Sequence, residues 1–177
     1  MRRLEFIIDG EPVPQGSMNG IPYRKKGKKN KWGVNQVYQN APEIRRFRKE
    51  TKKSITPFHD DFFVDDNEIG YIVEAIFYTT KPKSVSRPFP TVKGTGDIDK
   101  FFRALLDALT YSDTKNKVGL FKDDAQVVRV IGTKLYTDHE NPEPKTKVRI
   151  TKILLSNIEN ELKEFTDTVS DVFKGKD

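Results

Sequence analysis

The sequence predicts an α+β fold, in which a small mixed sheet of about four strands is packed against helices. Four separate segments have the alternating or β-rich apolar pattern of strands, and three others have apolar residues at helical spacing. Twelve Phe, six Tyr and one Trp supply enough large side chains for a modest core. A chain with these aromatic residues is expected to fold even though 33% of its residues are charged.

The overall composition narrows the class of protein further. The length of 177 residues fits one domain, which we place at 1–155, followed by an acidic amphipathic helix over 156–177. The lack of cysteine excludes disulfides, thiolate zinc sites and cysteine nucleophiles. No apolar run approaches the roughly 20 residues that cross a bilayer, and the N-terminus does not have the pattern of a signal peptide. We therefore expect a cytoplasmic protein with no membrane partner.

The first half of the chain begins with a predicted strand over 3–9, which ends at an Asp-Gly turn. Residues 15–34 contain four Gly and a run of lysines without an apolar period, so we expect a mobile basic loop. Pro42 stands near the start of a predicted helix that runs to about residue 54 and has a heavily basic surface. The alternation over 68–79 is typical of a half-buried strand.

The second half of the chain repeats the alternation of loops with regular elements. Three Pro and two Gly make 81–96 a predicted loop, and an apolar stripe at a spacing of three to four predicts a helix over 97–110. A second loop precedes two β-rich runs at 127–136 and 147–155. The sheet should therefore contain four strands, with an order that the sequence does not show.

Positive charge is concentrated in one stretch. The net charge is +6, and residues 21–53 contain twelve Lys or Arg against two Glu. Such a distribution indicates a polyanionic partner, although a solvated basic loop is the alternative interpretation. Trp32 lies among these cations and either stacks on unpaired bases or packs in the core. The DNA-binding candidates in this stretch are Lys25, Lys26, Lys28, Lys29, Lys31, Trp32, Arg45 and Arg46.

Acidic residues mark the start of the helix at 97–110. Asp97 and Asp99 lie where the loop enters the helix, a position at which carboxylates can cap free backbone N–H groups. Capping accounts for one of the two acids. On a helix, Asp99, Arg103 and Asp107 fall on one face, because each step of four residues adds roughly 40°. A surface ladder of ion pairs is the simplest alternative to a functional role for that face.

A second acidic pair, Asp123 and Asp124, immediately precedes an apolar strand. Acids at this position belong either to a turn or to a functional site. Taken together, Asp97, Asp99 and Asp124 offer three hard oxygen ligands of the kind that Mg²⁺ prefers. Arg103 lies four residues after Asp99, so its cation could stabilise the negative charge that develops on a phosphodiester bound at these acids.

These residues form a pattern, Asp97-x-Asp99-x-x-x-Arg103-x-x-x-Asp107 followed by Asp123-Asp124-Ala125-Gln126-Val127-Val128. The pattern resembles the RusA family of Holliday junction resolvases, which are small Mg²⁺-dependent endodeoxyribonucleases, often encoded by phages or prophages. The resemblance implies a RusA-like fold, metal ligation by Asp97, Asp99 and Asp124, and a catalytic role for Arg103. It implies a supporting role for Asp123 and, for Asp107, either catalytic support or helix packing. It covers residues 96–134 most specifically.

Two positions depart from the family pattern. Lys100 stands where the family usually has Asn, and Arg103 where it usually has Lys. Arg keeps the positive charge but does not donate a proton at ordinary pH, so Arg103 would serve an electrostatic role and not a proton-transfer role. Lys134 matches a basic residue of the family, and we include Lys100 and Lys134 among the DNA-binding candidates.

We therefore predict an Mg²⁺-dependent endonuclease that resolves four-way DNA junctions by paired nicks, in recombination and repair. A homodimer is expected, because the junction is two-fold symmetric and two matched nicks require two sites. Two alternatives remain: a catalytically inactive module that binds branched DNA, and a metal-dependent hydrolase of small phosphoesters. The first would bind without Mg²⁺ or the three Asp residues, and the second would not depend on the basic stretch.

Overall fold

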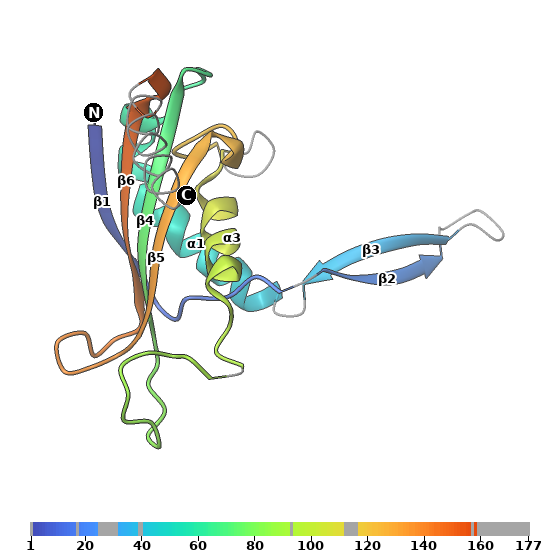
Figure 1. The fold of residues 1–177 in the computed structure, drawn as a ribbon. Coiled ribbons are helices and arrows are strands. Elements are labelled where there is room, and N and C mark those ends of the chain that lie inside the picture. Colours follow the sequence, from blue (N-terminus) through green and yellow to red (C-terminus); the bar gives the residue numbers. More distant parts are fainter. Residues whose placement is uncertain are drawn as a thin grey trace, which may run out of the picture.

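A computed structural model describes residues 2–16, 18–24, 32–38, 41–92, 94–111, 117–156 and 158. The fold is α+β, as predicted, with one mixed sheet and helices on it (Figure 1). Within these ranges, no helix is both long and apolar enough to cross a lipid bilayer.

Four strands form the main sheet, in the order β1 (Arg2–Asp9), β6 (Lys145–Leu154), β4 (Ile69–Thr79) and β5 (Val127–Tyr136). β6 is antiparallel to both of its neighbours, whereas β4 and β5 are parallel. Parallel neighbours need a crossover connection, and here that connection contains the helix α3 (Ile98–Leu109). The four strands and this helix are those that the apolar patterns predict, within a few residues at their ends.

Two long helices, α1 (Ala41–Ile55) and α3, pack on one face of the sheet (Figure 1). Alternate side chains of β4 face them, and Tyr71, Val73 and Phe77 are fully buried. The Phe77 ring contacts the rings of Phe101 and Phe102 on α3. Three short helical elements lie between the longer ones: η1 (Thr56–Phe58), α2 (His59–Phe62) and η2 (Asp124–Gln126).

The prediction of a loop without regular structure over 15–34 is wrong. This segment contains β2 (Met18–Arg24) and the start of β3 (Trp32–Tyr38), which pair antiparallel as a separate two-stranded ribbon. Figure 1 shows this ribbon projecting from the body of the protein. A ribbon that covers no core is held by backbone hydrogen bonds and needs no apolar alternation, which explains why the periodicity did not reveal it.

The predicted acidic helix at 156–177 lies almost entirely outside the described residues, which end at 156 and 158. The division of the chain at residue 155 therefore stays a prediction.

The contact between α3 and β5 depends on a glycine. The Phe102 ring and the Ile98 side chain lie directly over Gly132, so closely that a Cβ there would overlap the ring. Position 132 faces Ala75 of the neighbouring strand on the same side of the sheet. Small residues at both positions thus allow α3 to lie against the sheet, which sets where its first turn is held.

Replacing Gly132 with Ala should lower the free energy of unfolding by about 1–3 kcal/mol, the usual result of overpacking. Urea denaturation measures the loss, and Thr133→Ala at the exposed neighbouring position is the matched control. Adding Phe102→Leu to Gly132→Ala should recover part of the loss, because the two side chains share one space. A Gly132→Ala protein as stable as the wild type would contradict this account of the helix–sheet contact.

Candidate active site

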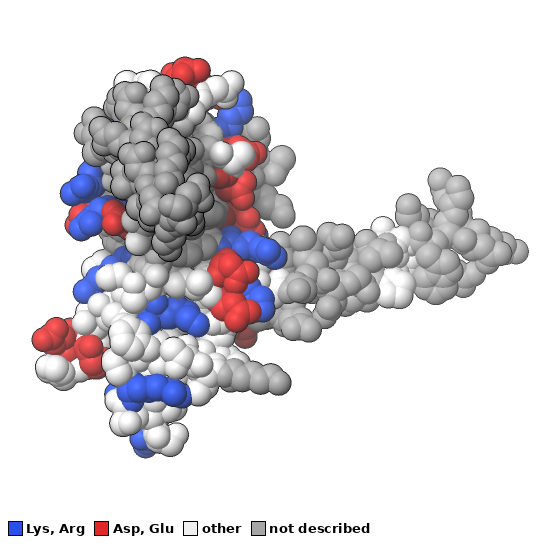
Figure 2. Space-filling model, viewed as in Figure 1, with Lys and Arg blue, Asp and Glu red and all other residues white. Residues whose placement is uncertain are grey.

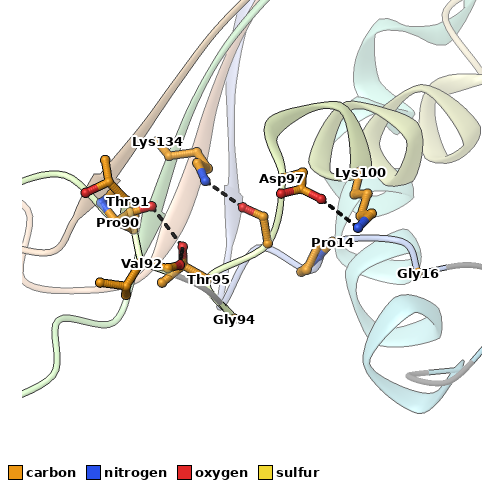
Figure 3. A pocket seen from close by; sticks show the side chains of 11 residues that line it. Pro14, Gly16, Pro90, Thr91, Val92, Gly94, Thr95, Asp97, Lys100 and Lys134 are labelled. Atoms are coloured by element: carbon orange, nitrogen blue, oxygen red, sulfur yellow. Dashed lines mark hydrogen bonds and ion pairs between the residues drawn. The ribbon is translucent and has the colours of Figure 1, made fainter.

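At the start of α3 lies a carboxylate, that of Asp97, which makes no hydrogen bond to the backbone of the helix although Asp97 is its N-cap residue. Its carboxylate instead accepts a hydrogen bond from Lys100, with 2.6 Å between Nζ and Oδ2 (Figure 3). This bond lowers the pKa of Asp97, to which the charge of Lys134 also contributes. The capping role that the sequence allows for Asp97 is therefore absent.

The backbone before Asp97 is fixed by two contacts. Gly96 has a φ of +80°, a conformation that L side chains rarely adopt, and it packs against Pro14 and Phe101. The Lys134 ammonium on β5 donates to the Gly96 carbonyl at 2.5 Å. Lys134 thus ties the loop to the sheet directly beside Asp97.

An open cavity of about 720 Å³ lies at this point (Figure 3). Its walls come from the loop before α3, from the chain after β1 and from β5. Asp97, Lys100 and Lys134 all line it, together with Thr91 and Thr95. The cavity therefore combines one carboxylate with two ammonium groups.

Asp99 and Arg103 lie further along α3 and are both exposed. Asp107 belongs to the same face, but its ion pair is with Arg48 of α1, at 2.6 Å. The side chain of Gln15 donates to the same oxygen of Asp107 at 2.9 Å. Asp107 is thereby held by two other segments of the chain, and the surface ladder is not its main interaction.

Gln15 and Arg48 were not singled out from the sequence. Gln15 is 3% exposed, and its backbone N–H donates to the Lys100 carbonyl at 2.9 Å, so the residue bridges Lys100 and Asp107 on one face of α3. Arg48 also donates to the Gln15 side chain. Arg48 follows the buried Phe47 by one position, at the edge of the apolar face of the helix. That position is the feature of the sequence that could have indicated a contact with the rest of the protein.

The two acids before β5, Asp123 and Asp124, have different environments and different roles. Asp123 caps η2 by accepting from the Ala125 N–H at 2.9 Å, and Gln126 completes a capping box. Asp124 follows as the first residue of the turn and is exposed. Burial contributes most to raising the pKa of Asp124, and the neighbouring Asp123 and the charge of Asp107 raise it further. Asp123 is thus a turn residue, and Asp124 is the acid that a site can use.

The chain between α3 and Asp124 is anchored by Lys52 of α1. Its ammonium donates to the carbonyls of Thr110 and Val118, at 2.7 and 2.5 Å. Burial, with a smaller contribution from the Arg48 charge, lowers the pKa of Lys52 to about 8. These bonds attach the connection to α1 at its start, Thr110, and again at Val118.

The structure does not gather the three predicted metal ligands into one cluster. Asp97 and Asp99 lie at the first turn of α3, whereas Asp124 interacts with Asp107, near the other end of the helix. Among the described residues, no three carboxylate or imidazole groups are close enough together to hold one ion. The donors are of the right kind for Mg²⁺, which one or two carboxylates together with substrate phosphate can hold. Asp97 and Asp99 therefore fit the ion once the Lys100 ammonium no longer occupies the Asp97 carboxylate. The ligand assignment stays a prediction.

The basic candidates fall partly outside the described ranges. Arg45 and Arg46 are exposed on α1, where six Lys or Arg accompany two Glu. Lys and Arg are interspersed with Asp and Glu over the described surface in Figure 2. Trp32 is described only as the first residue of β3, and the remaining candidates are not described: Lys25, Lys26, Lys28, Lys29 and Lys31.

Asp124→Asn should raise the melting temperature at pH 7 in metal-free buffer, because the ionised carboxylate is disfavoured where it lies. The folded-state pKa is above the unfolded value of 3.8, so the ionised group destabilises the protein increasingly as pH rises through that interval. Thermal unfolding at pH 3 should show no such difference, since the carboxyl is then protonated in both states. Asp123→Ala, which removes the cap, should lower stability by about 1 kcal/mol at pH 7. An unchanged or lower melting temperature for Asp124→Asn would contradict this.

The family comparison covers all of these residues. A family described as Endodeoxyribonuclease RusA matches residues 9–151, a range that contains every described residue of the candidate site. Curated proteins gave no match. Because the matched range spans well over half of the 177 residues, the chain belongs to the RusA family of endodeoxyribonucleases, enzymes that hydrolyse phosphodiester bonds in DNA.

Proposed function

We propose that this endodeoxyribonuclease cuts four-way DNA junctions by paired, symmetric nicks, in recombination and repair. The observation that carries the proposal is the first turn of α3, where exposed acids stand beside cations at the mouth of an open cavity. Membership of the RusA family supports the junction as substrate. The resemblance of the acidic motif to the family pattern supports Asp97, Asp99, Arg103 and Asp124 as the catalytic set.

The reaction is proposed to require Mg²⁺, with Asp97, Asp99 and Asp124 as its ligands. A divalent ion bound beside a phosphodiester polarises a phosphoryl oxygen and lowers the pKa of a bound water. One or two protein carboxylates with substrate phosphate suffice for Mg²⁺, so Asp97 and Asp99 are the first candidates to bind it. Asp124 completes the set by analogy with the family pattern.

Of the remaining residues, Arg103 is proposed to act on the DNA directly, and the others position the acidic groups. Arg103 is exposed on the same helix face as Asp99, where its guanidinium can hold the phosphate under attack and stabilise its developing negative charge. Lys134 positions the loop that carries Asp97, through its bond to the Gly96 carbonyl. Arg48 and Gln15 hold Asp107, which fixes the orientation of the second half of the helix face.

DNA affinity is assigned to the basic stretch between β2 and the end of α1. Arg45 and Arg46 project from the exposed side of α1, and phosphate contacts by such residues position a duplex without reading its sequence. Two such surfaces, one from each protomer of a homodimer, would match the two-fold symmetry of the junction. A cytoplasmic location follows from the proposed DNA substrate.

A nicking assay on a synthetic four-way junction and a matched linear duplex tests the activity. The wild-type protein should nick two opposite strands of the junction in Mg²⁺ and leave the duplex intact. A chelator should abolish cutting, and Asp99→Asn should reduce its rate by at least about 100-fold, as expected for loss of a metal ligand or electrostatic group. Asp60→Asn, an exposed acid on α2, is the matched control and should cut normally.

The other outcomes of this assay are also informative. Tight junction binding without cutting would support the inactive binding module. Equal cutting of junction and duplex would indicate a general nuclease. Singly nicked junctions as the only product would contradict the homodimer.

If the basic stretch binds DNA phosphates, the affinity for the junction should depend on salt concentration. Replacing Lys25, Lys26, Lys28 and Lys29 with Gln should weaken junction binding and flatten its salt dependence by about 0.9 for each lost phosphate contact. Fluorescence anisotropy at several salt concentrations measures both quantities. The double variant Lys145→Gln/Lys147→Gln, on β6, is the control and should keep the wild-type slope. An unchanged slope in the quadruple variant would favour an enzyme of small phosphoesters.

A further inference from the structure

The start of α3 carries more positive than negative charge. Asp97 and Asp99 share this region with Lys100, Arg103 and Lys134: the Lys134 charge acts on Asp97, and Asp99 and Arg103 both act on Lys100. The shortest contact is the one between Lys100 and Asp97, at 2.6 Å. The ammonium of Lys100 is therefore bound to Asp97, one of the two carboxylates proposed as the first ligands of the metal.

Helix stability does not account for this contact. A lysine in the first turn meets the positive end of the helix dipole, where a cation is disfavoured. Asp97 gives up the backbone cap that an N-cap carboxylate normally provides, in exchange for an exposed pair of a kind that contributes little to folding. The pairing is therefore better explained by the charge balance of the site than by the fold.

A divalent cation on Asp97 would change that balance. The ion and the Lys100 ammonium repel each other, so both cannot stay on one carboxylate at close range. Lys100 is 40% exposed and borders the open cavity, so its side chain has room to turn away from Asp97 (Figure 3). With the acids neutralised by the ion, the three nearby cations would be left without counter-charge, and a phosphate group would supply it.

We propose that Lys100 is an internal counter-ion of Asp97 that a divalent cation displaces, and that the freed ammonium then binds a DNA phosphate in the adjoining cavity. This inference rests on the proposed function, since it takes Asp97 as a metal ligand. Lys100 thereby weakens metal binding to the free protein and strengthens it when DNA is present. Metal and DNA bind cooperatively as a result.

The test measures Mn²⁺ binding to the full chain without DNA, by the electron paramagnetic resonance signal of free Mn²⁺. Lys100→Gln should bind Mn²⁺ about twofold to fivefold more tightly than wild type, the range that corresponds to an exposed ion pair. Arg149→Gln is the matched control, because Arg149 on β6 makes a similar exposed pair with Glu5 at 2.7 Å, and it should bind as wild type. Asp97→Asn should lose most of the binding.

Two results separate this inference from the proposed function. If Lys100→Gln binds Mn²⁺ as wild type while Asp97→Asn loses binding, the counter-ion role is overturned and the metal site stands. If Asp97→Asn and Asp99→Asn both bind as wild type, the proposed ligands themselves are wrong.

The second half of the proposal has its own measurement. Fluorescence anisotropy measures the affinity for the junction in Ca²⁺ and in chelator. The ratio of the first affinity to the second should be at least about twofold larger for wild type than for Lys100→Gln. Equal ratios would overturn the transfer of Lys100 to a phosphate.

Discussion

The rest of the structure depends on the close contact of α3 with the parallel pair β4 and β5. Gly132 leaves space for the Phe102 ring, and Phe77 packs against that ring from β4. This contact buries one side of α3 and turns the other side outward, so Asp99 and Arg103 reach solvent from a rigid support. A catalytic group on such a support keeps its position better than one on a loop.

The second half of the site is held by polar contacts across the chain. Asp107 receives Arg48 from α1 and Gln15 from the segment after β1, which links three elements at one carboxylate. Lys52 makes a comparable link from α1 to the connection after α3, at the carbonyls of Thr110 and Val118. The inner side of α1 thus holds the Asp107 carboxylate and the connection after α3 in place, and its exposed side carries Arg45 and Arg46.

The charges around α3 also suit a substrate that carries charge of its own. The ammonium of Lys100 and the carboxylate of Asp97 satisfy each other in the free protein, whereas phosphate and metal would satisfy them separately in a complex. The pKa of Asp124 is raised first by burial and further by the neighbouring acids Asp123 and Asp107, whose charges disfavour its ionised form. In the free protein, the Asp97 charge is therefore compensated by an internal ion pair, whereas the environment of Asp124 disfavours its charge.

The sequence by itself determined the four strands of the main sheet, α1 and α3, because each buries an apolar face whose period is visible in the chain. It also determined the family, since the acidic motif is local, and it identified Asp97, Asp99, Arg103 and Asp124 as candidates that remain to be tested. Only the tertiary structure decided that β2 and β3 form a ribbon, which has no core to face and so no apolar period. It alone decided that Lys100 pairs with Asp97 and that Arg48 and Gln15 meet Asp107. Two of these contacts join residues 59 and 92 positions apart, and a polar contact over such a distance leaves no periodic trace in the sequence.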